Sequence, residues 1–427
     1  MARRKITKKQ QKEIEKAAKK HPILTAVVLL LIIVIVGCCL LHRKRIIHIP
    51  FLDGIIPQET VDNGSGNGGG DTDIESAGGA FSAEDIQSIK DSKLSIHFLE
   101  LGNAYTGDCT LIKVGNTEVL IDAGSRKNSA PTIKEHLDTY CEDGVLEYVI
   151  ATHAHQDHIA GFIGNKNGDS RTGIFYQYEI GTLIQFARSD QELETEKGNP
   201  TLYAEYLDAV TYVEQQGTTV YTALDCWNEA NGAKKSYYLD AEQTVSMNIL
   251  YNYFYEHDSF GGGEENEYSV CMLLTQGENN YLFTGDLEEK GEEFLVQYNT
   301  LPQCQLFKGG HHGSYTASSE ALLSVIQPEI VCVCCCCGNM EYADEEYPEN
   351  DFPSQAFVDR VSKYTERVYV TTMVSDNEEG HQSMNGTIIL TSAGEAIMVR
   401  CSNNDTLFKD TDWFKENRIC PDKWKMT

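Results

Sequence analysis

The chain has 427 residues, enough for one large domain or two ordinary ones, and a formal net charge of −29. This charge is unevenly distributed, because residues 1–45 carry twelve basic and two acidic side chains while the remainder carries 23 basic and 62 acidic ones. Binding to a nucleic-acid backbone normally depends on clusters of Lys and Arg. The acidic composition therefore argues against a general nucleic-acid-binding surface on the body of the protein.

An uncharged apolar stretch lies near the N-terminus, from Ile23 to Leu41, and its 19 residues are just enough to cross a bilayer as a helix. Nine basic residues precede it and three follow it, so the positive-inside rule keeps residues 1–22 in the cytoplasm as a basic tail. A cleaved signal peptide would have a shorter apolar core and a small-residue cleavage site. The sequence predicts an uncleaved signal anchor at 23–41 in the cell membrane, with the rest of the chain extracellular.

The segment that follows the anchor, 42–92, contains a long run rich in Gly, Ser, Asp and Asn. Such a composition buries too little apolar surface to fold, so a flexible linker is predicted there. The folded domain is predicted to span residues 93–401. The remaining residues, 402–427, form a C-terminal tail with two of the three tryptophans, and the sequence leaves open whether this tail packs on the domain or faces a partner.

The folded part alternates between runs with the period of a strand and runs with the period of a helix. Strands are predicted at 94–101, 109–115, 117–124, 146–153, 217–223, 244–254, 268–277, 280–286, 329–337, 366–373 and 386–392. Helices are predicted at 129–141, 199–217, 318–328 and 354–365. This order suits an α/β fold in which two sheets pack face to face with helices outside, an αββα sandwich.

Five of the fourteen cysteines stand together in "VCVCCCCG", residues 331–338. A metal or redox cluster is one interpretation. A buried strand is the other, because free Cys packs as a small hydrophobic residue and adjacent side chains on a strand point to opposite faces. All five thiols could not bind one ion from a strand, so the buried strand is favoured.

The stretch "ATHAHQDHIAGF", residues 151–162, places three of the chain's twelve histidines and an aspartate within six residues. His153 and His155 lie two apart at a strand end and so share a face, while Asp157 and His158 can face a second position. Imidazole and carboxylate are suitable ligands for Zn²⁺, with Mn and Fe as alternatives. A bound divalent ion would activate water near neutral pH. A chance surface cluster is disfavoured by how few histidines the chain has.

This stretch resembles the HxHxDH signature of the metallo-β-lactamase superfamily, and the resemblance extends over roughly Leu94 to Arg400. The "IDAG" segment resembles the superfamily's turn at Asp122 and Gly124, and "TGD" resembles the strand end at Asp286. The segment "LFKGGHHGSYTASS" is similar to one of the branch represented by the β-lactamase-like domain of the ComEC competence proteins. The resemblance implies the αββα fold and a metal-dependent hydrolase.

The resemblance also implies a centre with two metal ions, Zn²⁺ in the first place and Mn²⁺ or Fe as alternatives. His153 and His155 would hold one ion. Asp157 and His158 would contribute to the other, and Asp286 would bridge the two.

The second ion would take a further ligand from the pair His311 and His312. His312 is favoured as this ligand, with His311 beside it or facing the substrate. Lys308 and Ser314 lie next to the pair and, with Asp157, are the candidate catalytic residues, because they could contact an anionic substrate. An ordinary surface lysine is an equal alternative for Lys308.

The sequence departs from the superfamily at the third ligand of the first ion. Many members have a further histidine between the first motif and the bridging aspartate, where this chain has only His257, in a glycine-rich loop. The segment "NEYS" at 266–269 resembles the "NxxS" of the ComEC branch instead. The site formed by His153 and His155 is therefore predicted to be the weaker of the two.

Three functions remain open from the sequence. The favoured one is hydrolysis of a phosphodiester, in a small molecule or a nucleic acid, by a membrane-anchored extracellular enzyme. A lactam or lactone hydrolase is the second. The third is a tethered metal-binding module without catalytic activity.

Overall fold

The computed structural model describes residues 81–168, 170–259, 264–343, 351–375, 380–394 and 396–425. None of the helices in this described part is long and apolar enough to cross a membrane. The predicted cytoplasmic tail, the predicted anchor and most of the predicted linker lie outside the described residues. The membrane anchoring and the extracellular location therefore stay predictions.

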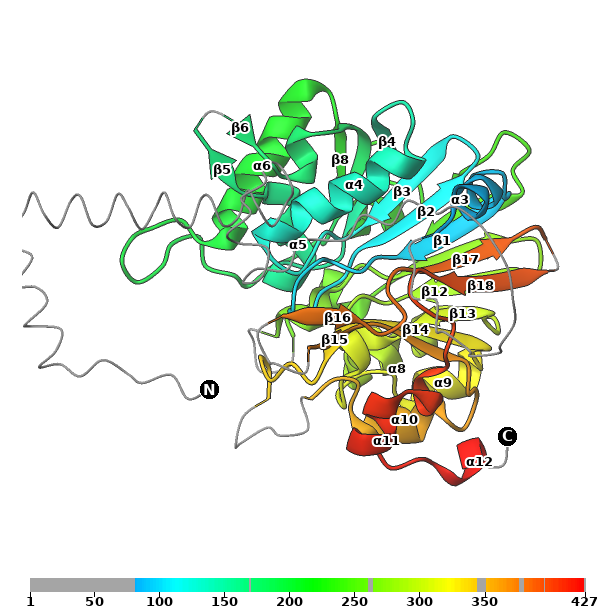
Figure 1. Cartoon of the computed structure of the whole chain (residues 1–427). Helices are drawn as coiled ribbons and strands as arrows, with labels where there is room; N and C mark the ends of the chain where they lie inside the picture. Colours follow the sequence, from blue (N-terminus) through cyan, green and yellow to red (C-terminus); the bar gives the residue numbers. More distant parts are fainter. Residues whose placement is uncertain are drawn as a thin grey trace, which may run out of the picture. The chain divides into compact units, whose positions relative to one another are not determined.

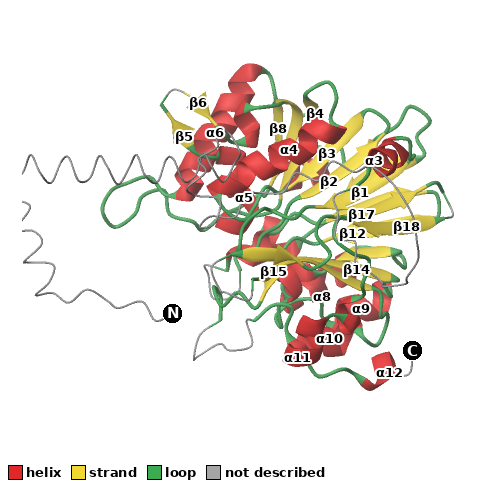
Figure 2. Ribbon diagram, viewed as in Figure 1, coloured by secondary structure: helices red, strands yellow, loops and turns green. Residues whose placement is uncertain are grey.

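Two eight-stranded sheets form the centre of the domain (Figure 1, Figure 2). The first has the order β18-β17-β1-β2-β3-β4-β7-β8, with strands β1 (Leu94–Phe98), β2 (Thr110–Val114), β3 (Thr117–Ile121), β4 (Val145–Ala151), β7 (Glu179–Gln185), β8 (Thr219–Thr222), β17 (Ile388–Ser392) and β18 (Ile397–Cys401). The second has the order β16-β15-β14-β13-β12-β11-β10-β9, with strands β9 (Ser236–Tyr238), β10 (Val245–Ile249), β11 (Met272–Gln276), β12 (Asn279–Phe283), β13 (Leu306–Lys308), β14 (Ile330–Cys337), β15 (Val368–Val374) and β16 (His381–Ser383). A small separate hairpin pairs β5 (Lys166–Asn167) with β6 (Ser170–Arg171).

Helices cover the two sheets from outside (Figure 1). Those beside the first sheet are α3 (Ala83–Lys90), α4 (Ala130–Tyr140), α5 (Gln156–Ile163) and α6 (Leu202–Gln216). Those beside the second are α8 (Glu289–Tyr298), α9 (Glu320–Ile326), α10 (Gln355–Val361), α11 (Asp412–Asn417) and α12 (Asp422–Lys425). Helix α7 (Ala223–Asn228) follows β8 and contacts β7 and β8 of the first sheet and β10 of the second. The predicted αββα arrangement is confirmed.

Each sheet combines an antiparallel part with a run of parallel strands. In the first sheet β3, β4, β7 and β8 are parallel, and in the second sheet β12, β13, β14 and β15 are parallel. Ligand sites in α/β folds form where the carboxyl ends of parallel strands meet. Asp122, His153, Asp286 and the pair His311–His312 all follow closely on the ends of such strands.

Some elements escaped the sequence prediction. Strand β7 was missed because Gly181 interrupts its apolar run, yet this glycine allows close strand contact, since a Cβ there would lie 2.7 Å from the carbonyl oxygen of Glu147. The residues after His155 form the first turn of helix α5, which was missed, with His155 as its N-terminal cap residue. Helix α8 was missed as well, and its Leu295 is fully buried.

The N-terminal boundary of the folded part lies earlier than residue 93. Helix α3 falls within the segment predicted as a linker, and a capping box formed by Ser82 and Asp85 starts it. Its Ile89 is buried in the core, and Phe81 packs against the same core. The linker prediction is therefore wrong for the residues from 81 onwards.

The residues after 401 pack on the domain. Phe408, Phe414 and Trp424 are buried in the apolar cluster on the outer side of the second sheet. The indole of Trp424 also donates a hydrogen bond to the carbonyl oxygen of Thr365, 2.9 Å away. The described part of the tail, up to residue 425, thus belongs to the folded domain.

The cysteine-rich run forms β14, and all eight of its residues are buried. Cys332 and Cys334 lie in the core between the sheets, whereas Cys335 and Cys337 lie in the cluster on the outer side. Burial raises the pKa of the thiols of Cys332, Cys334 and Cys335 well above the usual range. The interpretation as a buried strand is confirmed.

Two histidines lie together where helix α4 packs on strand β1: His97 is buried, and His136, on the helix, is partly exposed. His97 Nδ1 and His136 Nε2 are 2.8 Å apart, and His97 Nε2 lies 2.8 Å from Ser95 Oγ. Burial lowers the pKa of His136 to about 4. Burial, followed by the charges of His136 and Lys113, holds the pKa of His97 well below its usual value. Both imidazoles are therefore neutral in the folded protein near pH 7.

This pair predicts that acid destabilises the domain. Between about pH 6.5 and the pKa of about 4 of His136, the unfolded chain binds protons at these positions and the folded chain does not. Stability is expected to fall by roughly 2 kcal/mol between pH 7 and pH 5 through His136. Urea unfolding at both pH values should show a smaller difference for His136→Gln than for the wild type. The exposed His257 supplies the control His257→Gln, and equal pH dependence in all three proteins would contradict the prediction.

Candidate metal centre

The candidate ligands come from both sheets, and the backbone is strained where several of them stand. Asp122 follows β3 with φ of 57°, and His311 and His312 follow β13 with φ of 45° and 54°. Positive φ is uncommon for residues other than glycine and is often found at functional sites. The motif histidines, by contrast, lie on the end of β4 and the first turn of α5.

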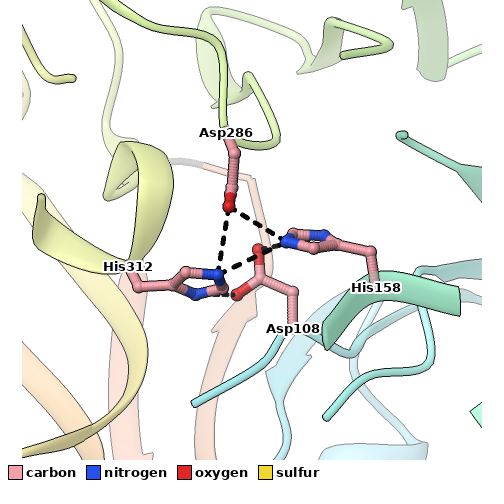
Figure 3. A group of neighbouring side chains, drawn as sticks. All are labelled: Asp108, His158, Asp286 and His312. Carbon is pink, nitrogen blue, oxygen red and sulfur yellow. Dashed lines mark hydrogen bonds and ion pairs between the residues drawn. The ribbon is translucent and has the colours of Figure 1, made fainter. Parts of the chain in front are cut away.

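Three ligand atoms converge at the centre of this group (Figure 3). Asp286 Oδ2 lies 3.1 Å from His158 Nε2 and 3.1 Å from His312 Nε2, and the two Nε2 atoms are 3.3 Å apart. A tetrahedral Zn²⁺ with bonds of about 2.0–2.1 Å separates its ligand atoms by about 3.3 Å. The three atoms therefore have the spacing of three corners of such a coordination shell.

The other ring nitrogens of these two histidines are occupied on the far side. His158 Nδ1 lies 2.7 Å from Asp122 Oδ2, and His312 Nδ1 lies 2.9 Å from the carbonyl oxygen of Cys334. An acceptor at Nδ1 holds the proton there and leaves the lone pair of Nε2 for a metal. Asp122 is itself held by the amide and the hydroxyl of Thr152.

Asp157 lies beside His312. Its Oδ2 lies 3.2 Å from His312 Nε2. The same oxygen accepts a hydrogen bond from the hydroxyl of Tyr342 at 2.8 Å. Asp157 thus adds an oxygen as a fourth candidate ligand atom to those of His158, Asp286 and His312.

His153 and His155 form a pair of their own. His153 Nε2 and His155 Nδ1 are 3.1 Å apart, the spacing expected for two ligands of one ion. Burial, followed by the charge of His158, lowers the pKa of His153 well below its usual value, so its imidazole is neutral as a ligand must be. His153 Nδ1 lies 3.5 Å from the hydroxyl of Ser269, the last residue of "NEYS". Ser269 therefore contacts the other ring nitrogen of His153, not the Nε2 that faces His155, and so supports the ring without taking the place of a third ligand.

His311 is turned towards the cleft and not towards the other ligands. Its Nδ1 lies 3.0 Å from Thr316 Oγ1 and 3.4 Å from Glu288 Oε1, and its Nε2 is 3.9 Å from Asp286 Oδ2. Of the two neighbouring histidines, His312 is the one at ligand distance from Asp286.

Lys308 and Ser314 lie behind the ligands. Lys308 is 3% exposed, forms an ion pair with Asp108 and lies 3.7 Å from Asp286. The alternative that it is a surface lysine is wrong. Ser314 is fully buried and its hydroxyl lies 3.0 Å from that of Thr316. Neither is among the described residues that line the cleft, so direct contact of either with a substrate, as the sequence analysis expects, has no support in the geometry.

Asp108 is a residue that the sequence analysis missed. It belongs with His158, Asp286 and His312 to a group whose potential ligand atoms all lie within 4.8 Å of one another (Figure 3). Its Oδ1, however, lies 3.2 Å from Nδ1 of His312, on the side of the ring away from Asp286. We therefore assign Asp108 to the support of His312 and to the pairing with Lys308. Its place in "YTGDC", just before β2, was the signal available in the sequence.

The buried charges of the centre favour a cation. Four carboxylates (Asp108, Asp122, Asp157 and Asp286) are buried there beside a single lysine. Burial alone would lower the pKa of His158 and of His312. The negative charge of Asp286 acts on both rings, and Asp122 beside His158 and Asp108 beside His312 add to it. The pKa of each histidine is therefore raised well above its usual value. Oδ1 of Asp286 is buried and accepts no hydrogen bond from any described residue. Buried carboxylates that outnumber the permanent cations beside them are unfavourable, so these residues fit one or more divalent ions.

A cleft of ≈ 640 Å³ opens beside the ligands. His155, Asp157, Asp286 and His311 line it together with Arg126 and three aromatic residues, Tyr315, Tyr342 and Phe352. The metal centre is therefore accessible from a space large enough for a small ligand.

Parts of this chain are similar to the metallo-beta-lactamase superfamily, to a recombination protein and to a competence protein. Residues 102–164 match the family model of the metallo-beta-lactamase superfamily. Recombination protein 2 of Haemophilus influenzae is 29% identical over 109 residues, which are 26% of this chain and 12% of that protein. Competence protein ComA of Neisseria gonorrhoeae is 40% identical over 67 residues, 16% of this chain and 10% of that protein. The chain thus spans only about a tenth of the length of these relatives. The predicted resemblance to the superfamily and to its ComEC-like branch is confirmed.

Among solved structures, the short form of human tRNase Z is similar with a TM-score of 0.33 and 12% identity, over 67% of this chain and 94% of that one.

Proposed function

We propose that this protein is a metal-dependent hydrolase that cleaves phosphodiesters, with Zn²⁺ as the first candidate metal and Mn²⁺ or Fe as alternatives. The observation that carries this proposal is the convergence of His158 Nε2, His312 Nε2 and Asp286 Oδ2, 3.1–3.3 Å apart, at the edge of a cleft. The resemblance to the metallo-β-lactamase superfamily supports it.

Two positions for ions are proposed. His158, His312 and Asp157 would hold one ion, and His153 and His155 the other. Asp286, whose Oδ2 lies at the first position and whose Oδ1 accepts no hydrogen bond among the described residues, would serve both. The chemistry that such ions supply when bound is polarisation of a phosphoryl oxygen and activation of water.

His311 is the proposed general acid. Its Nδ1 is held by Glu288 and Thr316, and its Nε2 stands near Asp286 at the wall of the cleft. In hydrolysis a water oxygen bonds to phosphorus and the bond from phosphorus to the leaving oxygen breaks. A proton on Nε2 of His311 would pass to that oxygen, so that the product leaves as an alcohol.

Two observations bear on the proposed substrate class. A competence protein and a recombination protein are among the relatives, which keeps a nucleic-acid substrate as a second candidate. The acidic composition of the chain favours a small phosphodiester instead. Membrane anchoring through residues 23–41, with the domain outside the cell, is part of the proposal.

Metal analysis of the purified full chain, followed by a substrate panel, tests the proposed function. We expect bound divalent metal and metal-dependent hydrolysis of bis-p-nitrophenyl phosphate, lost with chelator and restored by metal. Hydrolysis of nitrocefin without phosphodiesterase activity would support a lactam hydrolase instead. A folded protein that binds metal and hydrolyses nothing in the panel would support a binding module.

A further inference from the structure

The charge of the cleft is unusual for a site that acts on phosphate esters. Five carboxylates line it: Asp157, Glu264, Asp286, Glu288 and Glu341. Arg126 is the one lysine or arginine that the described part of the chain contributes to the lining. A polyanion needs several cationic contacts along its backbone, whereas a single phosphodiester needs one.

Arg126 is positioned in advance by its own loop. Its guanidinium carbon lies 4.2 Å from the ring centre of Tyr105, and its Nη1 donates to the carbonyl oxygen of Ser125 at 3.2 Å. Its backbone amide donates to the hydroxyl of Ser129, also at 3.2 Å. Stacking of this kind fixes the plane of the guanidinium. In the amide orientation that satisfies its neighbours, the side-chain oxygen of Gln156 accepts from Nε of Arg126, 3.1 Å away, and from Nη1. Nη2 is therefore the nitrogen left for an anion.

Glu341 occupies this nitrogen in the structure. Arg126 Nη2 forms an ion pair with Glu341 Oε1, and both side chains are partly exposed. Exposed ion pairs contribute little to stability. A phosphate oxygen can replace this carboxylate at Nη2, where it accepts a charge-assisted hydrogen bond.

An aromatic wall stands in the same cleft. The rings of Tyr342 and Phe352 lie 5.8 Å apart at 32°, and Phe352 also lies 5.8 Å from the ring of His311. Aromatic walls of this kind stack on planar groups, and nucleobases gain roughly 1–3 kcal/mol per base from such stacking. The cleft volume of ≈ 640 Å³ falls within the range of small-molecule sites.

We propose that the substrate is a small phosphodiester with a single phosphate and a base-like ring, that Arg126 leaves Glu341 to bind this phosphate, and that the exposed Tyr342, backed by the buried Phe352, stacks on the ring. This proposal rests on the proposed function, because it names the substrate of the same metal centre. It makes Arg126 the residue that selects for one negative charge.

Calorimetry on the metal-loaded full chain tests this selection. The probes are a thymidine dinucleotide and its analogue with an uncharged methylphosphonate linkage, which have nearly the same shape. The wild type should bind the charged probe roughly 10- to 100-fold more tightly. Arg126→Gln should reduce this preference several-fold, because the metal ions supply only the remainder, and Arg126→Lys should restore part of it. Arg171, which lies 4.8 Å from the ring centre of Tyr176 outside the cleft, gives the matched control Arg171→Gln, which should behave as the wild type.

Salt dependence of binding separates a small substrate from a polymer. One phosphate contact predicts a slope of about −1 or less steep for log K against log[salt], and a 20-nucleotide single strand with several contacts gives a much steeper one. Tighter and steeply salt-dependent binding of the single strand would overturn the proposal, as would a charge preference unchanged in Arg126→Gln. Binding that depends on Arg126, without hydrolysis of any diester, would refute the proposed function and leave the anion contact standing.

Discussion

Replacing His158 with alanine is expected to remove metal from the protein and to lower phosphodiester hydrolysis more than 100-fold. His158 Nε2 lies 3.1 Å from Asp286 Oδ2 and 3.3 Å from His312 Nε2, so the substitution deletes one corner of the proposed coordination shell. Loss of a residue that only supports a ligand typically lowers metal affinity or activity by roughly 10- to 100-fold. Loss of a ligand should exceed that range. Metal-to-protein ratio after dialysis, measured beside activity, checks the result.

Asp122→Asn is the matched, milder change. Asp122 lies 2.7 Å from His158 Nδ1 and is a support of that ring, not one of the proposed ligands. Asparagine tolerates the φ of 57° that this position requires, so the backbone is expected to stay in place. The variant should lose roughly 10- to 100-fold in metal affinity. If His158→Ala keeps its metal, or if the two variants have the same effect, the assigned order of ligand and support is wrong.

Gly124→Ala is expected to prevent folding of the domain or to destabilise it by more than about 4 kcal/mol. A Cβ at Gly124 would lie 1.6 Å from the carbonyl oxygen of Asp157 and 2.9 Å from the amide of Asp108. Both neighbours are backbone atoms that a rotamer change cannot move away. The amide of Gly124 also donates to the carbonyl oxygen of Asp108 at 2.7 Å, so the collision would push apart two loops of the metal centre.

Gly115→Ala separates this collision from the general effect of removing a glycine. Gly115 lies in the turn between β2 and β3 with φ of 61°, and nothing lies within 4 Å of the Cβ position. The left-handed conformation alone should destabilise by about 1–2 kcal/mol. Yield of folded protein and the urea unfolding midpoint compare the two variants. A Gly124→Ala protein no less stable than Gly115→Ala would contradict the close packing of the two loops.

The sequence was sufficient for those parts of the site that are local in the chain. The motif from His153 to His158 and the pair His311–His312 can be recognised in the sequence because several potential ligands lie within a few residues of one another. Asp108 and Arg126 had no such neighbours. Asp108 reaches the centre because β2 and β13 belong to different sheets that the fold brings together, and pairing with Lys308 across the sheets is visible only in three dimensions.

The fold itself was predictable where hydrophobic periodicity was strong. Strand β14, an unbroken apolar run, was predicted almost to the residue. Strand β7 was not predicted because Gly181, which allows close contact with the neighbouring strand, interrupts the apolar pattern of the sequence. Helix α3 was lost because only Ile89 is fully buried on it, so that its composition resembles that of the segment before it.

The division of the ligands between the two sheets has a further consequence. His158 follows β4 of the first sheet, whereas Asp286 and His312 follow β12 and β13 of the second. An ion bound by all three would hold the two sheets of the domain together. The unfolded chain would not bring these ligands together. The binding energy of the ion then adds to the free energy of unfolding and grows with the logarithm of metal concentration. The domain would thereby be most resistant to unfolding and proteolysis where the metal is plentiful, so that metal supply would govern how long the protein survives as well as what it does.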